Sequence, residues 1–256
     1  MTKARAIYYG CRGRTAERFE GGVVVFPLYD DNPLKFPVPP LVTWGLIALN
    51  VLIFIIEVSS STEASNAIIA SFGATPAALV RDIPLTGGMP PELTLITSMF
   101  LHGGWEHLLG NMIYLWVFGD DIEAALGRVR FIIFYLAAGI IAALAYIALN
   151  PHSTTPLVGA SGAISGILAA YLMLRPCAKV SVFVLRVVVR IRAYWVIGGW
   201  VLLQLYFLAA STDDGVAYGA HVGGLIAGAG LFFLLRPVGT ELFECMEQPG
   251  EEAVAS

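Results

Sequence analysis

Four polar residues stand inside stretches of the chain that are otherwise strongly apolar. They are His107 and Asn111 in HLLGNMIYLW, Ser161 in GASGAISG and His221 in YGAHVGG. A serine hydroxyl is a weak nucleophile until an adjacent base takes its proton, and a histidine can take that proton and return it to a leaving amine. The spacing of His107 and Asn111 puts both on one helix face, where they can donate hydrogen bonds to a developing negative charge. These residue types predict nucleophilic attack by Ser161, with His221 as its base.

The stretches that carry these residues have the composition of membrane helices. Of the 256 residues, 57% are hydrophobic and 13% are charged, whereas a soluble domain has roughly 25% charged residues. A helix needs about 20 apolar residues to cross a bilayer. We therefore expect an all-α membrane protein with six spans, which occupy residues 41–236 between polar tails at 1–40 and 237–256. The expected spans are Thr43–Val58, His102–Phe118, Phe131–Leu149, Ser161–Leu174, Tyr194–Ala210 and Val216–Leu235.

The positions of the basic residues predict which way these spans point. Of the 15 lysines and arginines, only Arg81 falls in a connection on the outer side of the six-span arrangement. Basic residues accumulate on the cytoplasmic side, so both termini are expected there. Cys11, Cys177 and Cys245 form no CxxC pair and would lie near the reducing side, which predicts free thiols. The sequence has no run of basic residues that would indicate a nucleic-acid partner.

With this orientation, the spans that carry the polar residues all enter from the outside. Ser161–Leu174 has 14 residues, which make about 21 Å of helix in a hydrocarbon core about 30 Å thick. Ser161 is therefore expected to lie recessed, at the N-terminus of its helix, where backbone N–H groups favour negative charge. Gly224 and Gly228 form a face of small residues with Ala220 in the sixth span and would let it pack closely on another helix. The fourth span is the expected partner, because Ser161, Gly166 and Ala169 are small.

Segments outside the spans have more ordinary interpretations. The connection Ser59–Leu101 is expected to be a loop broken by short apolar pieces such as Ala67–Phe72. The segment Lys179–Arg192 is rich in β-branched residues and indicates a strand pair or an amphipathic piece at the membrane surface. Glu123 and Arg128, near the cytoplasmic end of the second span, are expected to cap and brace the loop there. His102 is expected to have a structural or gating role.

At these polar residues the sequence resembles the rhomboid family of intramembrane serine proteases. The resemblance runs from Pro27 to about Leu235 and rests on FPLYDDNP, FLHGGWEHLLGNMIYLWVFGDDIE, GASGAISG, GGWVLLQL and AHVGGLIAG. Three of these motifs stand in order on alternate spans, which makes the resemblance specific.

The resemblance implies a six-helix bundle and a serine endopeptidase with a Ser161–His221 dyad. Asn111, His107 and the Ser161 backbone N–H would form its oxyanion site. The implied substrates are transmembrane helices of other membrane proteins, cleaved near their outer ends at small residues with helix-breaking residues nearby. The lipid bilayer is the other partner, and no metal or cofactor is expected.

The sequence departs from the family pattern at two places. A Trp-Arg pair that some members carry in the first outer loop is missing here. Some members also have a tyrosine four residues after the nucleophile, where it stacks on the histidine, and this chain has Ser165 instead. How His221 is held is therefore open. Asp213 or Asp214 could orient it as a third member, although a dyad is favoured over a triad.

Other functions fit the residues less well. A zinc protease could use His102, Glu106 and His107, but HGGWEH lacks the HExxH spacing that puts two histidines on one helix face. A transporter would need polar residues leading to both faces, and the cytoplasmic halves of the spans are apolar. His107 and Asn111 could also serve only to pin helices together. The N-terminal MTKARAIYYGCRGRTAERFEGG has no apolar core, which favours a prokaryotic plasma membrane over an organelle.

Overall fold

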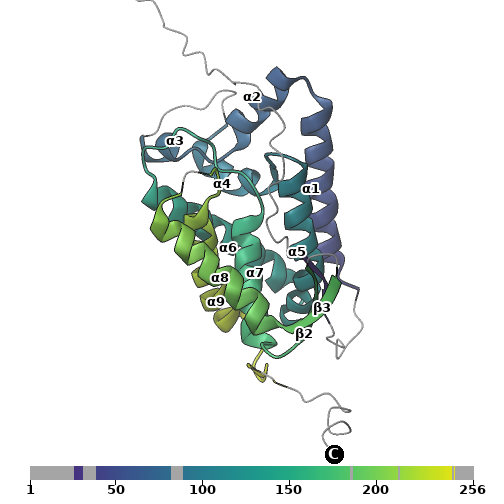
Figure 1. The fold of residues 1–256 in the computed structure, drawn as a ribbon. Helices are drawn as coiled ribbons and strands as arrows, with labels where there is room; N and C mark the ends of the chain where they lie inside the picture. Colours follow the sequence, from purple (N-terminus) through teal and green to yellow (C-terminus); the bar gives the residue numbers. More distant parts are fainter. Residues whose placement is uncertain are drawn as a thin grey trace, which may run out of the picture.

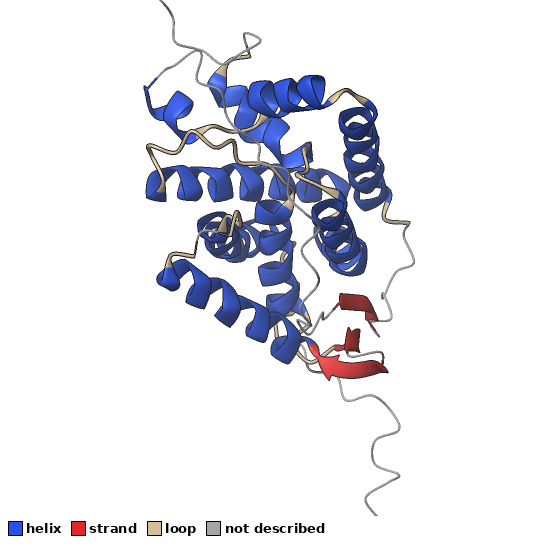
Figure 2. Cartoon of the chain, turned by 45° about the horizontal axis from the view of Figure 1, so that its top comes forward, coloured by secondary structure: helices blue, strands red, loops and turns tan. Residues whose placement is uncertain are grey.

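Helices make up most of the chain in a computed structural model, which describes residues 26–30, 39–81, 89–184, 187–212, 214–243 and 245. Figure 2 shows these helices forming the body of the protein, with the strands gathered at one end. Each range predicted to span the membrane overlaps one long helix. The long helices are α1 (Leu41–Ser59), α5 (Trp105–Leu126), α6 (Arg128–Leu149), α7 (Ser161–Leu174), α8 (Ala193–Ala210) and α9 (Tyr218–Leu235).

Among the described residues, four helices are long and apolar enough to cross a membrane: α1, α6, α8 and α9. Helix α7 is apolar but has only 14 residues. Helix α5 has 22 residues and carries acidic side chains at both ends, from Glu106 to Glu123. The chain is thus a mostly helical protein with several helices that could cross a membrane. The count of six spans and the side on which the termini lie stay predictions.

Helix α7 lies among α5, α6 and α9, and most of its side chains are buried. Its contact with α9 is a backbone-to-backbone approach at two levels. A Cβ atom added to Gly224 would lie 2.1 Å from the carbonyl oxygen of Gly162, and one added to Gly228 would lie 2.2 Å from the Cα of Gly166. The predicted packing of the small residues in these two segments is confirmed. Only glycine permits this approach, because any Cβ would overlap the opposite backbone.

A three-stranded antiparallel sheet lies at one end of the helices (Figure 1). Strands β2 (Lys179–Val184) and β3 (Val187–Arg192) form the hairpin that the sequence predicted as one alternative. Strand β1 (Phe26–Asp30) pairs with β2 and was not predicted. The expectation of an all-α fold is therefore wrong in this detail, because β1 takes its hydrogen-bond partner from a distant part of the sequence.

The connection between α1 and α5 is more regular than expected. Instead of a loop, it contains α2 (Thr62–Phe72), α3 (Pro76–Arg81), η1 (Pro91–Leu93), α4 (Thr94–Thr97) and η2 (Ser98–Phe100). These short helices lie at the end opposite the sheet (Figure 1). Ala74 and Leu157 exchange backbone hydrogen bonds of 3.0 and 2.9 Å, so this connection is attached to the segment that leads into α7.

Glu123 caps α1, a contact that the sequence did not predict, since Glu123 was expected to brace the loop that follows α5. Its carboxylate accepts hydrogen bonds from the backbone N–H groups of Val42 and Thr43, at 3.0 and 2.7 Å, and from the Thr43 hydroxyl at 2.8 Å. The Arg128 guanidinium lies 3.9 Å away. A carboxylate at a helix N-terminus satisfies free N–H groups and favours the helix dipole. The contact fixes α1 to α5.

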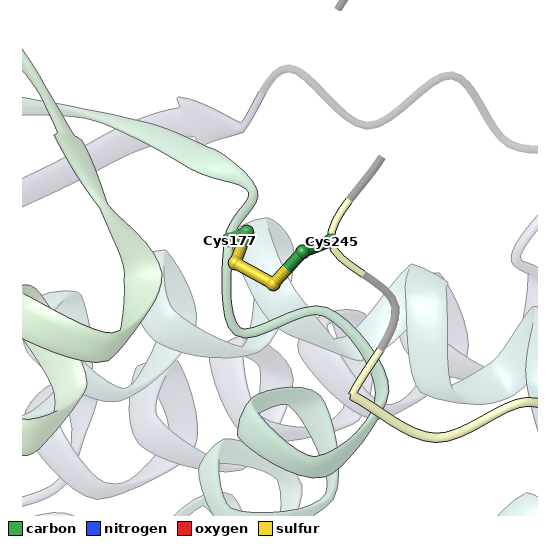
Figure 3. The surroundings of a disulfide bond; sticks show 2 residues. All are labelled: Cys177 and Cys245. Atoms are coloured by element: carbon green, nitrogen blue, oxygen red, sulfur yellow. A yellow bond between two sulfur atoms is a disulfide. The ribbon is translucent and has the colours of Figure 1, made fainter. Parts of the chain in front are cut away.

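Cys177 and Cys245 form a disulfide (Figure 3), so the prediction of free thiols is wrong for this pair. The two cysteines are separated by 68 residues. The segment after α9 folds back against the end of α7, where the Phe243 N–H donates to the Met173 carbonyl oxygen at 2.7 Å. This return of the chain brings Cys245 to Cys177, and no local sequence pattern indicates it. Cys11 lies outside the described residues.

Candidate active site

Ser161 is the first residue of α7, and His221 lies one turn into α9. The close approach of these two helices brings the side chains together, with the Ser161 Oγ 2.9 Å from the His221 Nε2. His221 is buried, with 9% of its surface exposed. A hydroxyl at this distance from an imidazole nitrogen can transfer its proton to it when the nitrogen carries its lone pair on that side. The structure therefore brings together the two residues predicted as nucleophile and base.

His107 and Asn111 lie one turn apart on α5, and both face the residues that precede Ser161. The contact point is Gly159, whose φ of 118° favours glycine. A Cβ atom there would lie 2.6 Å from the His107 Nε2 and 3.7 Å from the Asn111 Nδ2. The absence of a side chain at Gly159 thus lets both groups approach the segment leading into Ser161.

Asn111 has an unused hydrogen-bond donor. Its Nδ2 is buried and finds no hydrogen-bond partner among the described residues. An unpaired buried donor costs free energy, about 1–3 kcal/mol for a typical polar group. Such a group is retained where a ligand or a reaction intermediate uses it. Asn111 therefore has the property expected of a donor to a transient oxyanion.

Two cavities meet at Ser161. The larger, of about 1360 Å³, is open to the surface and reaches His107, Ser161 and His221. The smaller has a volume of about 20 Å³ and is lined mainly by small residues. Its lining includes Gly139, Ala142, Ala143, Gly162, Ala163 and Ala220. A space of this size holds about one water molecule or one methyl group.

Gln204 of α8 is a site residue that the sequence did not single out. Its Oε1 lies 2.7 Å from the His221 Nδ1, on the opposite side of the ring from Ser161. Trp200, one turn earlier on α8, packs against the same imidazole with ring centres 5.7 Å apart. The signal that could have found Gln204 is its polarity within an apolar span, because such residues mark functional positions.

The predicted alternatives for holding His221 have other partners. Asp214 accepts hydrogen bonds from the Val216 N–H and the Tyr218 hydroxyl. Asp213 lies outside the described residues. The Ser165 hydroxyl donates to the Ser161 carbonyl oxygen at 2.6 Å and not to the imidazole.

His102 lies beside the candidate site and contributes no hydrogen bond from its ring. It is 2% exposed, and neither ring nitrogen has a partner among the described residues. The ring packs edge to face against Phe54 and His107, with centres 6.4 and 5.1 Å apart. It thereby packs against the His107 ring, which fits the first of the two roles predicted for it, structural or gating.

Comparison with known proteins places this site in a family. Residues 90–238 match the Rhomboid domain, a region that contains the four predicted site residues. Rhomboid protease GluP of Bacillus subtilis is 31% identical over 201 residues, which is 78% of this chain and 35% of that protein. Rhomboid protein 1, mitochondrial, of Saccharomyces cerevisiae is 33% identical over 146 residues, 54% of this chain and 40% of that protein.

A human relative gives a similar result. Presenilin-associated rhomboid-like protein, mitochondrial, is 32% identical over 143 residues, which cover 55% of this chain and 35% of the relative. The matched region thus spans between a third and two fifths of the length of these curated relatives. The family match covers more than half of the chain and includes both partners of the hydrogen bond between α7 and α9. The chain belongs to the rhomboid family.

Proposed function

We propose that the chain is an intramembrane serine endopeptidase that cleaves transmembrane helices with a Ser161–His221 dyad. The observation that carries this proposal is the 2.9 Å separation between the Ser161 Oγ and the His221 Nε2, two residues that line an open cavity. Membership of a family whose relatives include a named rhomboid protease supports the same reaction.

In the proposed reaction, the Ser161 Oγ attacks the scissile carbonyl carbon while its proton moves to the His221 Nε2. The tetrahedral intermediate collapses, the C–N bond breaks, and His221 gives the proton to the departing amine. A water molecule then attacks the acyl group on Ser161, with His221 again as the base. This step releases the new carboxyl end and restores the serine hydroxyl.

The oxyanion of the tetrahedral intermediate would be stabilised by Asn111, His107 and the backbone N–H of Ser161. The unpaired Nδ2 of Asn111 and the approach of both α5 side chains to Gly159 support this assignment. Ser161 adds the positive end of a helix, because the first N–H groups of α7 have no intrahelical acceptor. Donors fixed in a water-poor site favour negative charge without having to reorganise.

The two cavities favour a substrate with a small side chain at the scissile bond. The cavity of about 20 Å³ beside Ser161 has room for a methyl group, whereas a leucine or phenylalanine side chain would overlap its walls. The larger cavity can hold an extended segment on the open side of Ser161. A transmembrane helix would have to unwind locally to enter, which fits substrates with helix-breaking residues near the cleaved bond.

The proposal includes a membrane arrangement. All six long helices would cross the bilayer, with the α2–α4 connection outside, the sheet at the cytoplasmic face and both termini cytoplasmic. Residues 41–236 form the membrane domain, between cytoplasmic tails at 1–40 and 237–256. The proposed location is a prokaryotic plasma membrane, and the relatives above include both a bacterial protein and proteins named as mitochondrial.

Labelling with a serine-directed phosphonate tests the proposal. Purified protein should become covalently modified, and peptide mapping should locate the adduct on Ser161. Ser161→Ala should abolish the labelling, whereas Ser59→Ala, which alters an exposed serine at the end of α1, should label like the wild type. An adduct elsewhere, or undiminished labelling of Ser161→Ala, would refute the assignment.

A further inference from the structure

The imidazole of His221 is held from the side opposite Ser161 by one helix, α8. Only three residues of this helix are buried: Ala193, Ile197 and Gln204. Their spacing of four and seven residues puts them on one helix face. Gln204 is the only one of the three with a polar side chain, and only 7% of its surface is exposed.

The contact between Gln204 and His221 determines which ring nitrogen carries the proton. The Gln204 Oε1 can only accept a hydrogen bond, so at 2.7 Å from Nδ1 it selects the tautomer with a proton on Nδ1. The lone pair of that tautomer lies on Nε2, 2.9 Å from the Ser161 hydroxyl. This is the tautomer that a general base needs, and a buried acceptor on Nδ1 serves the same purpose in proteases with a serine triad.

Trp200 adds packing to this hydrogen bond. It lies one helical turn before Gln204 and packs against the same imidazole in a tilted arrangement, with ring planes at 37° and centres 5.7 Å apart. Tyr218 packs edge to face against the ring from α9 itself. The other polar groups considered for this role, on Ser165 and Asp214, bind elsewhere. Helix α8 thus supplies both the hydrogen-bond acceptor for His221 and an aromatic ring that packs against its imidazole.

We infer that Gln204 is the positioning residue of the catalytic base: its Oε1 holds His221 in the Nδ1–H tautomer and aims Nε2 at Ser161. The inference rests on the proposed protease function and adds a third residue to its dyad. Because the amide is neutral, it orients the ring without supplying the negative charge that a triad aspartate adds. The catalytic geometry therefore depends on α8 staying against α9 at this level.

Steady-state cleavage of a synthetic transmembrane peptide with alanine at the cut site tests the inference. Gln204→Leu removes the acceptor and should lower kcat by about 10- to 100-fold, less than the roughly 10⁴-fold loss known for a buried triad aspartate changed to asparagine. KM should stay unchanged because Gln204 binds His221 and not the substrate. Gln204→Glu keeps an acceptor at the same position and should restore kcat to within about threefold of the wild type.

A control on the same face of α8 separates positioning from packing. Ile197→Ala lies about two turns from Gln204 and should lower the thermal unfolding temperature while leaving kcat unchanged. If Gln204→Leu is too unstable to purify, Gln204→Met offers an unbranched side chain of similar length without the acceptor. Wild-type kcat in the Leu or Met variant, or a Glu variant as slow as the Leu variant, would overturn the inference.

The outcomes also distinguish this inference from the proposed function. If wild-type protein shows no cleavage that depends on Ser161, the protease proposal itself fails. If the wild type cleaves and the Ser161 and His221 variants do not, while Gln204→Leu keeps its kcat, only the positioning role is wrong.

Discussion

Gly166 and Gly228 face each other across the contact of α7 with α9, so closely that a Cβ atom on Gly228 would lie 2.2 Å from the Cα of Gly166. This contact lies between one and two turns along the helices from the hydrogen bond between Ser161 and His221. The approach of the two helices that carry the proposed nucleophile and its base therefore depends on glycines, which have no functional group.

The first prediction concerns this contact. Gly228→Ala should push α9 away from α7, destabilise the protein by about 1–3 kcal/mol and lower the cleavage rate. Gly230→Ala on the same helix is a matched control, because a Cβ there meets nothing within 4 Å. Thermal unfolding in detergent, followed by circular dichroism, measures the difference. Equal stability of the two variants would contradict the packing described here.

The second prediction concerns the dyad. Ser161→Ala removes the nucleophile and His221→Ala removes its base, so each should abolish cleavage of a model transmembrane substrate. The double variant should be no slower than either single variant, because the two residues act as one unit. A metal chelator should leave the wild-type rate unchanged. Loss of activity on chelation would instead support the zinc alternative.

The third prediction concerns Asn111. Asn111→Ala should lower kcat by about 10²- to 10³-fold, which is the usual effect of losing one oxyanion donor. The unfolding temperature should change little, because the Asn111 Nδ2 has no hydrogen-bond partner to lose in the resting protein. A large drop in stability with normal turnover would assign Asn111 the role of a helix pin.

The fourth prediction concerns the direction of the chain in the membrane. In a variant with its three cysteines replaced by serine, Thr212→Cys should react with a membrane-impermeant maleimide added outside intact cells. Val188→Cys, an exposed position on β3, should react only after the cells are opened. The reverse pattern would put the sheet and the disulfide on the outer side, where disulfides persist more readily.

The positions of the long helices could be predicted from the sequence, because each long apolar block overlaps one long helix. Ser161 and His221 could be paired because each is a polar residue in an apolar span. Gln204 is also a polar residue in an apolar span, but the residue that it contacts depends on how α8 is rotated about its axis. Apolar residues surround most of α8, so the sequence does not indicate that rotation.

Contacts between segments that are far apart in the sequence could not be predicted either. Strand β1 exists because β2 is beside it, and neither segment encodes the other's position. The pairing of Cys177 with Cys245 needs the chain after α9 to return to the end of α7. Ser165 was recognised as a departure from the family pattern, yet only the three-dimensional arrangement reveals that Trp200 occupies one side of the imidazole instead.

The disulfide affects whether proteolytic fragments of the protein separate. It closes a covalent ring that includes β2, β3, α8 and α9, and both Gln204 and His221 lie within that ring. A protease that nicks the turn between α8 and α9 would therefore leave the two fragments tethered to each other. Such a nicked protein would migrate as one band in a non-reducing gel and as two bands after reduction.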